Sequence, residues 1–352
     1  MKRKLLALTM TTFMIGQIAA CGNAAESVAS DASTESEVSV EESTESIEET
    51  EEIKVEEDSS EEPEKEEEKP KIEVEEGIVD MIPNKIVLPY EGECGTVEAI
   101  TYMAKDYTGD GPEVEKKAYV YLPAGYDETK QYNVMYLMHG IGGNENEWGL
   151  NKDGNSRIKR VMDNLIGEGI IEPFIVVTPN GKAMACTHEE TNDLFYLYGH
   201  ELRNDLIPYI ESHYSTYAEY SEDGYDLSQA REHRAMAGLS MGGMQTINIG
   251  MCECLDAFSW FGAFSSAPTS YPATKVAELI AENEYPIDYF YALCGTEDQI
   301  AYASASAAAK TLPAFSEKIK DGENFTWQEK PGTHDFGIWY LGFYNFARLV
   351  FQ

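Results

Sequence analysis

Residues 238–242, with the sequence G-L-S-M-G, carry a pattern that points to nucleophilic chemistry. They follow an apolar stretch typical of a strand and precede a stretch typical of a helix, which is the setting of a nucleophile elbow. A turn this tight needs glycine on both sides of the serine to avoid steric clash, and it presents the serine oxygen at the start of the helix. The pattern predicts that Ser240 attacks a carbonyl carbon and forms a covalent intermediate.

A serine nucleophile needs a base, and the order of residues along the chain limits the choice. In this strand–turn–helix architecture the serine comes first, then Asp or Glu, then histidine. The chain has six histidines, and only His334 follows Ser240. It stands in a loop containing Gly and Pro, between the last expected strand and the last expected helix. We therefore predict that His334 is the general base.

The acid that orients the histidine is expected in a loop after a strand between these two residues. The expected strand at 289–294 is followed by G-T-E-D, so Asp298 or Glu297 could accept the Nδ1–H of His334 and stabilise the imidazolium. Asp335 is a third candidate, although a neighbour in sequence rarely turns its carboxylate onto the ring. Position and residue type favour Asp298 slightly.

Two backbone N–H groups are needed to stabilise the oxyanion of the tetrahedral intermediate. One is expected from Met241, which follows the nucleophile at the start of its helix. The other is expected in residues 139–144, H-G-I-G-G-N, where glycines let the backbone approach the substrate, and we choose Ile141. Spacing excludes a phosphate cradle here, because neither G-x-G-x-x-G nor a following G-K-[ST] occurs.

These residues need a scaffold that brings distant loops together, and the order of expected elements supplies one. Strands are expected at 96–103, 117–122, 132–139, 174–178, 233–238, 260–264, 289–294 and 326–329, and helices at 156–167, 193–213, 241–251, 273–283, 303–320 and 336–351. No helix separates the first two strands, and strands and helices alternate from residue 132 onward. This order predicts an α/β fold: a mainly parallel central sheet with helices on both faces and an antiparallel N-terminal edge.

Charge is spread unevenly along the 352 residues. The chain has 26 Lys+Arg against 63 Asp+Glu, a net charge of −37, which excludes a basic nucleic-acid-binding protein. Residues 26–76 contain 23 acidic residues, four lysines and no aromatic residue, so this segment cannot bury enough apolar surface to fold. We expect an acidic disordered tether at 21–76 and a catalytic domain at 77–352.

The first 21 residues have the features of an export signal. A basic start, K-R-K, is followed by an apolar stretch that ends in I-A-A-C at Cys21. This resembles a bacterial lipobox, which implies a lipoprotein signal peptide at 1–20 and a lipid on Cys21. The protein is then expected at the extracellular face of the bacterial cell membrane, with the acidic tether as a spacer.

Four motifs together resemble one protein family. They are H-G-I-G-G-N-E-N-E-W at 139–148, G-L-S-M-G-G-M-Q-T at 238–246, G-T-E-D at 295–298 and T-H-D-F-G-I-W at 333–339. From about residue 96 to its end, the chain resembles the esterase D-like family, especially its bacterial feruloyl esterase branch in carbohydrate esterase family 1. The resemblance implies an α/β-hydrolase fold, a triad of Ser240, Asp298 and His334, and oxyanion donors at Ile141 and Met241.

The resemblance also implies an activity. It predicts a serine carboxylic-ester hydrolase acting on acylated carbohydrate, above all on feruloyl (hydroxycinnamoyl) esters of plant xylan fragments, with no cofactor and no metal. Acetylxylan esterases and acyltransferases of the same family are the alternatives, and a non-catalytic surface binding protein is a more remote one. The expected partners are a small-molecule or oligosaccharide ester and the membrane that holds the lipid.

Aromatic side chains near the motifs are candidates for a platform under the sugar or the phenolic acyl group. Trp148 follows the oxyanion glycines and Trp260 begins the strand after the elbow helix, so both are candidate substrate contacts, with packing in the core as the alternative. The polar, Tyr-rich residues 214–232 are either a cover over the site or a surface loop. Five cysteines remain besides Cys21, an odd number that cannot pair completely, and we expect mainly buried free thiols.

Overall fold

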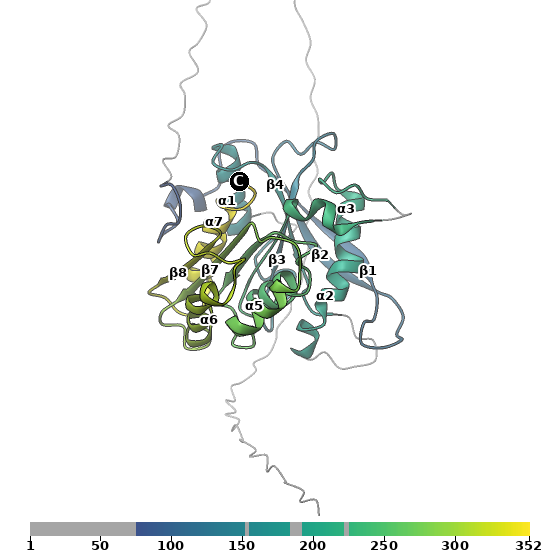
Figure 1. Cartoon of the computed structure of the whole chain (residues 1–352). Coiled ribbons are helices and arrows are strands. Elements are labelled where there is room, and N and C mark those ends of the chain that lie inside the picture. The colour runs from purple at the N-terminus through teal and green to yellow at the C-terminus, as the bar shows by residue number, and fades with distance from the viewer. Residues whose placement is uncertain (1–74, 152–154, 184–191, 222–224) are drawn as a thin grey trace, which may run out of the picture. The chain divides into compact units, whose positions relative to one another are not determined.

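The computed structural model describes residues 75–151, 155–183, 192–221 and 225–352 (Figure 1). The expected signal peptide, Cys21 and the expected tether up to residue 74 lie outside the described residues. The segment that precedes the sheet is attached near the C-terminus. Arg348 donates a hydrogen bond to the backbone oxygen of Glu75, and the side chain of Asn345 pairs with both backbone groups of Val79.

Within the described residues, eight strands form one sheet in the order β1-β2-β4-β3-β5-β6-β7-β8 (Figure 1). Strands β3 to β8 run parallel, whereas β1 and β2 form an antiparallel edge, which confirms the predicted fold class. The strands are β1 Thr96–Ala104, β2 Val114–Leu122, β3 Asn133–Met138, β4 Phe174–Pro179, β5 Arg234–Leu239, β6 Trp260–Phe264, β7 Tyr289–Gly295 and β8 Phe325–Lys330.

Side chains that alternate along the strands enter two apolar cores, one on each face of the sheet. In β3, Val134 and Tyr136 pack in one core, and Met135 and Leu137 pack in the other. The Met135 core is covered by α1 (Arg157–Gly167) and α7 (Phe336–Ala347), and the Tyr136 core by α2 (Tyr198–Glu201), α3 (Ile207–His213), α5 (Ala273–Ala281) and α6 (Tyr302–Phe315). The sheet is therefore enclosed on both faces, and its carboxyl edge is where loops gather.

The helix expected at 193–213 is interrupted in the structure. It consists of η2 (Asn192–Phe195), α2, η3 (Leu202–Leu206) and α3, and η3 has π-helical hydrogen bonds. Pro208 stands in the first turn of α3 and has no N–H to continue a regular ladder. The helix expected at 241–251 is likewise α4 (Met241–Gln245) followed by the π-helical η5 (Thr246–Met251). The segment η1 (Asn84–Val87) precedes β1 in sequence, and η4 (Leu227–His233) leads directly into β5.

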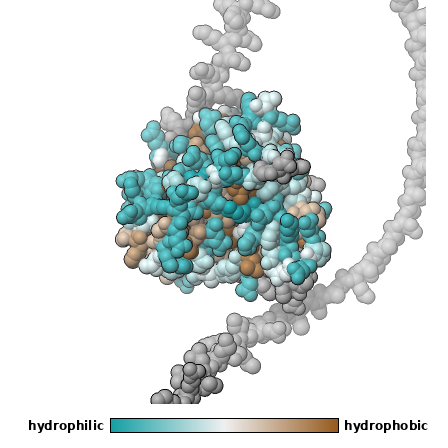
Figure 2. Space-filling model, turned by 45° about the vertical axis from the view of Figure 1, so that its right-hand side comes forward, coloured by the Kyte–Doolittle hydropathy of each residue, from teal (hydrophilic) through white to brown (hydrophobic). Residues whose placement is uncertain are grey.

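The surface in view in Figure 2 is mostly hydrophilic, with hydrophobic side chains gathered only in small groups. In the part of the chain that the structure covers, no helix has the length and apolar character needed to cross a membrane. Cys94, Cys252, Cys254 and Cys294 are free thiols, and two of them, Cys254 and Cys294, are buried.

Candidate active site

Strand β5 brings Ser240 to the carboxyl edge of the sheet. The strand is buried along its whole length, and the chain turns at Ser240 with φ 50° and ψ −113°, a conformation that costs energy for a residue other than glycine. A Cβ on Gly238 would lie 2.6 Å from the backbone carbon of Gly242, and a Cβ on Gly242 would lie 2.5 Å from the backbone oxygen of Met138. Close backbone contacts therefore explain both glycines of the pattern.

Backbone hydrogen bonds hold this strained turn in place. The N–H of Ser240 donates to the oxygen of Phe264 at 3.0 Å, and the oxygen of Ser240 accepts from Ala267 at 2.9 Å and from Met244 at 3.0 Å. Phe264 and Ala267 belong to the end of β6 and the loop after it. The neighbouring strand and the helix that starts at Met241 therefore both fix the position of the nucleophile.

The structure brings Ser240, His334 and Asp298 together from three separate loops. Nε2 of His334 lies 3.0 Å from Oγ of Ser240, and Nδ1 of His334 lies 2.6 Å from Oδ2 of Asp298. With the Nδ1–H donated to the carboxylate, Nε2 carries no proton and can accept the one on Ser240 Oγ. This is the geometry that general-base activation of a serine requires.

Asp298 is held so that one of its oxygens faces the imidazole. Its Oδ1 accepts the N–H of Ile300 at 2.9 Å and of Ala301 at 2.8 Å, which leaves Oδ2 for His334. Burial alone would raise the pKa of Asp298, but these N–H groups and His334 outweigh it and hold the pKa below its ordinary value. The carboxylate therefore stays ionised beside the imidazole.

The two alternative acids point elsewhere. The side chain of Glu297 is exposed to solvent, whereas that of its sequence neighbour Asp298 is buried. Asp335 accepts the N–H of Gly337 at 2.7 Å and caps the start of α7, and Thr333 also donates to it. Neither carboxylate contacts His334, so the structure selects Asp298 among the three candidates.

The glycine loop after β3 lies against the nucleophile. A Cβ on Gly140 would lie 2.7 Å from Cδ1 of Leu239 and 3.3 Å from Cβ of Ser240. Within the described part of the chain, the N–H groups of Ile141 and Met241 have no hydrogen-bond acceptor. Both can therefore bind an oxyanion formed next to Ser240, and their role as oxyanion donors stays a prediction.

Trp148 is buried in the core, which argues against the expected substrate contact. Its side chain is 1% exposed, and its indole N–H donates to the backbone oxygen of Met138 at 2.9 Å. Four aromatic rings surround the indole, those of Phe264, Phe336, Tyr340 and Phe343. Trp148 belongs to the core under the glycine loop, where it links this loop to the end of β3.

Trp260 is also distant from the nucleophile, which argues against the second expected substrate contact. It is the first residue of β6, whereas Ser240 follows the last residue of the parallel neighbour β5. The two residues therefore lie at opposite edges of the sheet. The indole N–H of Trp260 donates to the backbone oxygen of Glu232, and its ring packs against Phe351.

Residues at both ends of the 214–232 segment also lie at this far edge. Thr216 forms a β-bridge with Tyr132, the residue just before β3, and the ring of Tyr217 stacks at 3.7 Å on His233, the residue just before β5. These contacts place Thr216 and Tyr217 at the edge of the sheet opposite Ser240. They favour the surface-loop alternative over a cover.

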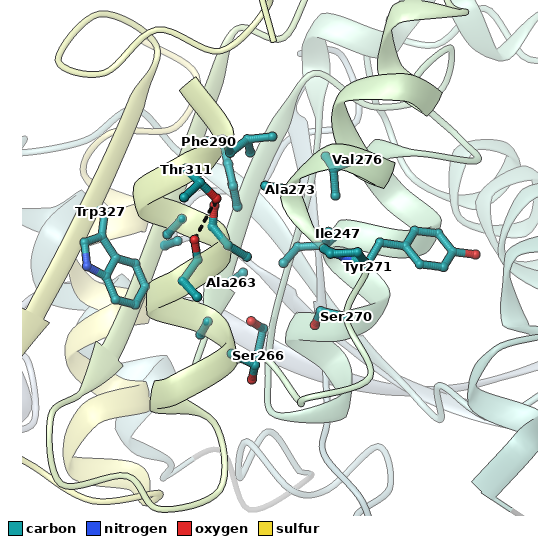
Figure 3. Close-up of a pocket in the computed structure, with 18 of the residues that line it drawn as sticks. Ile247, Ala263, Ser266, Ser270, Tyr271, Ala273, Val276, Phe290, Thr311 and Trp327 are labelled. Atoms are coloured by element: carbon teal, nitrogen blue, oxygen red, sulfur yellow. Dashed lines mark hydrogen bonds between the residues drawn. The ribbon is translucent and has the colours of Figure 1, made fainter. Parts of the chain in front are cut away.

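A cavity of about 490 Å³ lies beside the site, between α5 and α6 (Figure 3). Ile247, Val276 and Phe290 line it with apolar groups (Figure 3). Ser266 also lines it and lies close to the elbow, since a Cβ on Gly243 would lie 3.0 Å from its Cα. Its lining includes neither Ser240 nor the other two residues of the triad. The cavity is thus a neighbour of the reacting groups and does not enclose them.

Two residues of the glycine motif were not singled out from the sequence. Glu147 accepts the N–H of Gly140 at 2.6 Å, and burial raises the pKa of its carboxyl. His139 is 1% exposed and contacts Gly140 as well as Gly181 in another loop. Their place in the motif could have indicated this role. A glycine-rich loop needs side chains that hold its backbone in place, and Glu147 and His139 are polar residues next to these glycines.

A nucleophile elbow on a mainly parallel sheet, with the histidine supplied after the last strand, is the arrangement of serine hydrolases with the α/β-hydrolase fold. The family model described as "Esterase: Putative esterase" matches residues 111–339. The chain belongs to this esterase family.

Similar proteins include xylanases and feruloyl esterases. The chain is 37% identical to endo-1,4-beta-xylanase Y of Acetivibrio thermocellus over 235 residues. This matched region covers 63% of this chain and 20% of that protein. It is 29% identical to an endo-1,4-beta-xylanase/feruloyl esterase of Xylanibacter ruminicola over 253 residues. Here the matched region covers 66% of this chain and 30% of that protein. The chain thus spans less than a third of the length of either relative.

Solved structures match as well, among them one that is covered over nearly all of its length. It is a serine-to-alanine mutant of the feruloyl esterase module from Clostridium thermocellum, complexed with sinapinate. The sequence identity is 31% and the TM-score is 0.65, over 79% of this chain and 95% of that one. The similarity therefore extends over a whole esterase module.

Proposed function

We propose that the protein is a serine esterase that hydrolyses feruloyl (hydroxycinnamoyl) esters of plant xylan fragments. One observation carries the ester-hydrolase part: Nε2 of His334 lies 3.0 Å from Oγ of Ser240, while Asp298 binds the other ring nitrogen. The relatives support the substrate part, because they include a xylanase/feruloyl esterase and a feruloyl esterase module complexed with sinapinate.

The reaction has two steps, and a proton moves through His334 in both. First, Ser240 Oγ gives its proton to Nε2 and bonds to the ester carbonyl carbon, and the N–H groups of Ile141 and Met241 stabilise the oxyanion. The carbon–oxygen bond to the alcohol breaks as Nε2 gives the proton to the leaving oxygen. Water then gives a proton to Nε2 and attacks the acyl-enzyme, and the acid leaves as the proton returns to Oγ.

Hydrolysis of methyl ferulate beside acetylated xylo-oligosaccharide by the full chain tests the proposal, with Ser240→Ala as the blank. We expect release of ferulate, and a loss of turnover on the order of 10⁶-fold in the variant with unchanged Tm. Release of acetate alone would instead place the protein among acetylxylan esterases. Wild-type turnover in Ser240→Ala would refute the nucleophile. An added acceptor alcohol separates acyl transfer from hydrolysis, because transfer yields a new ester.

We also propose that Cys21 carries a lipid and that the enzyme is held at the extracellular face of the bacterial cell membrane. The basic start, the apolar stretch and the I-A-A-C sequence support this. Cys21→Ser is expected to move the protein out of the membrane fraction, and a variant that stays there would contradict a lipid on this residue. Protease added to intact cells is expected to digest the wild-type domain, and protection would contradict the location.

A further inference from the structure

His139 is a buried imidazole whose two nitrogens contact two different loops. Nδ1 lies 2.8 Å from the backbone oxygen of Gly140, and Nε2 accepts the N–H of Gly181 at 2.9 Å. Since Nε2 faces a donor, the proton of the neutral ring is on Nδ1. The imidazole therefore accepts from the loop after β4 and donates to the loop after β3.

Lys116, on β2, contacts the loop after β4 from the other side. Its Nζ donates to the backbone oxygen of Asn180 at 3.0 Å and to that of Lys182 at 2.5 Å, and it forms an ion pair with Glu201. The Lys116 side chain is 4% exposed. These three acceptors use all three N–H groups of the ammonium.

Two peptide groups connect these side chains. The C=O of Asn180 and the N–H of Gly181 belong to one planar trans peptide, and the C=O of Gly140 and the N–H of Ile141 belong to another. In such a peptide the C=O and the N–H point in opposite directions. The hydrogen bonds therefore form one series, from Lys116 through the first peptide, the imidazole and the second peptide, in which each donor faces the next acceptor.

We propose that His139 and Lys116 are positioning residues that orient and polarise the N–H of Ile141 toward the oxyanion. The proposal rests on the ester hydrolysis proposed at Ser240, since the series acts only where an oxyanion forms. Hydrogen bonds aligned in one direction strengthen one another, and the ammonium at the start places positive charge behind the last donor. The Ile141 N–H is therefore a stronger and better directed donor than an amide in an unsupported loop.

Other contacts hold the two loops without entering the series. Glu147 accepts the N–H of Gly140 at 2.6 Å, and Gln245 on α4 donates to the backbone oxygen of Gly181 at 2.6 Å. The backbone oxygen of Gly140 also accepts the N–H of Gly143 at 3.2 Å. A substitution at His139 therefore leaves that oxygen with one of its two donors, and we expect the peptide before Ile141 to tilt while both loops stay attached.

The surroundings of His139 favour the neutral ring that the series needs. Burial lowers the pKa of His139 to about 4. The hydrogen bonds to Gly140 and to the side chain of Asn180 oppose this shift, and the nearby charges of Lys182 and Lys116 add to it. A protonated ring would carry a hydrogen on Nε2 that faces the N–H of Gly181. The series is therefore intact at neutral pH.

Two substitutions of His139 separate the roles of its nitrogens. His139→Asn keeps an N–H near the position of Nδ1, whereas His139→Gln keeps an acceptor near Nε2 and loses the donor to Gly140. Loss of an oxyanion donor costs about 10²–10³-fold in kcat, and we expect the tilted donor of His139→Gln to cost roughly tenfold or more on methyl ferulate. KM should be unchanged, and His139→Asn should keep most of kcat. Equal losses in both variants, or a loss expressed in KM, would overturn the proposal.

The contribution of Lys116 is measured in the double variant Lys116→Met, Glu201→Gln, which leaves no buried carboxylate without its cation. We expect a loss in kcat of about two- to fivefold, because aligned hydrogen bonds strengthen one another by roughly 10–30%. Lys318→Met and His233→Gln are matched controls at the far edge of the sheet. Lys318 binds backbone oxygens just before β7, and His233, just before β5, contacts the side-chain oxygen of Asn133 at the start of β3. A double variant with wild-type kcat and Tm would remove Lys116 from the proposal.

Two further measurements separate this proposal from the proposed function. The first is nitrogen-15 NMR of the full chain at pH 7, in which the His139→Gln variant identifies the signals of His139. We expect the ring to be protonated at Nδ1. A ring protonated at Nε2 would overturn the proposal even if the protein is an active esterase. If no ester is cleaved, the rate at which a fluorophosphonate labels Ser240 replaces kcat, because its P=O oxygen uses the same donors. The same order, His139→Asn faster than His139→Gln, is then expected, and equal rates would overturn the proposal.

Discussion

Asp298→Asn tests whether this carboxylate sets the position of the proton on His334. The two side chains have nearly the same shape, so the variant is expected to fold. Oδ1 of Asp298 accepts the N–H of Ile300 at 2.9 Å and of Ala301 at 2.8 Å. The amide oxygen of the variant keeps this place, because the opposite orientation would lose two hydrogen bonds of about 1 kcal/mol each. Its NH₂ group then faces Nδ1 of His334.

A donor at that place forces Nδ1 to accept, so the ring proton of His334 moves to Nε2. Nε2 lies 3.0 Å from Oγ of Ser240 and then cannot take the proton of the serine. A wrong tautomer in such a triad lowers kcat by about 10⁴-fold, which is about 5 kcal/mol of transition-state stabilisation. KM is expected to change little, because Asp298 is 3% exposed and acts behind the imidazole.

The assay is steady-state hydrolysis of methyl ferulate, with Glu297→Gln and Asp335→Asn as matched controls. Glu297 is exposed, and Asn can replace Asp335 as a helix cap, so both controls should keep wild-type kcat. A loss below about 100-fold in Asp298→Asn, or an equal loss in either control, would refute the tautomer argument. Tm recorded for all three variants shows whether the fold is intact.

Trp148→Phe should lower the free energy of unfolding by about 1–3 kcal/mol, because the backbone oxygen of Met138 loses its buried donor; a raised KM with unchanged stability would indicate substrate contact instead. Trp260→Phe, at the far edge of the sheet, should leave KM unchanged, and a higher KM would contradict its placement. The pKa of His139 is lowered from 6.5 to about 4, so the unfolded chain takes up this proton first and stability falls as the pH drops. Urea unfolding between pH 7 and pH 4 should show a loss about 3 kcal/mol larger in the wild type than in His139→Gln, and parallel curves would refute this.

Much of the site followed from the sequence because parallel strands bring their carboxyl ends to one edge of a sheet. Ser240 follows β5, Asp298 follows β7 and His334 follows β8, so a correct assignment of strands already predicted that the three loops meet. The same rule places Trp260 away from the triad, because the first residue of a parallel strand lies at the opposite edge of the sheet.

The direction of single side chains could not be predicted in this way. Glu297 and Asp298 are neighbours, and the turn after β7, in which the N–H of Asp298 donates to the backbone oxygen of Gly295, decides which of them faces inward. Trp148 stands next to the glycine loop in sequence, but an aromatic cluster that includes residues of α7 encloses it. Contacts between segments far apart in the chain determine both outcomes.

The hydrogen-bond series behind Ile141 depends on the order of strands in the sheet, which differs from their order in the chain. Strand β4 lies between β2 and β3, although it follows both in sequence. The antiparallel register pairs Ala118 with Pro179, so Lys116 lies beside the loop after β4, and the parallel register of β3 with β4 places His139 beside the same loop. The insertion of β4 thus separates the ammonium from the imidazole by one peptide and places a buried cation behind the oxyanion loop.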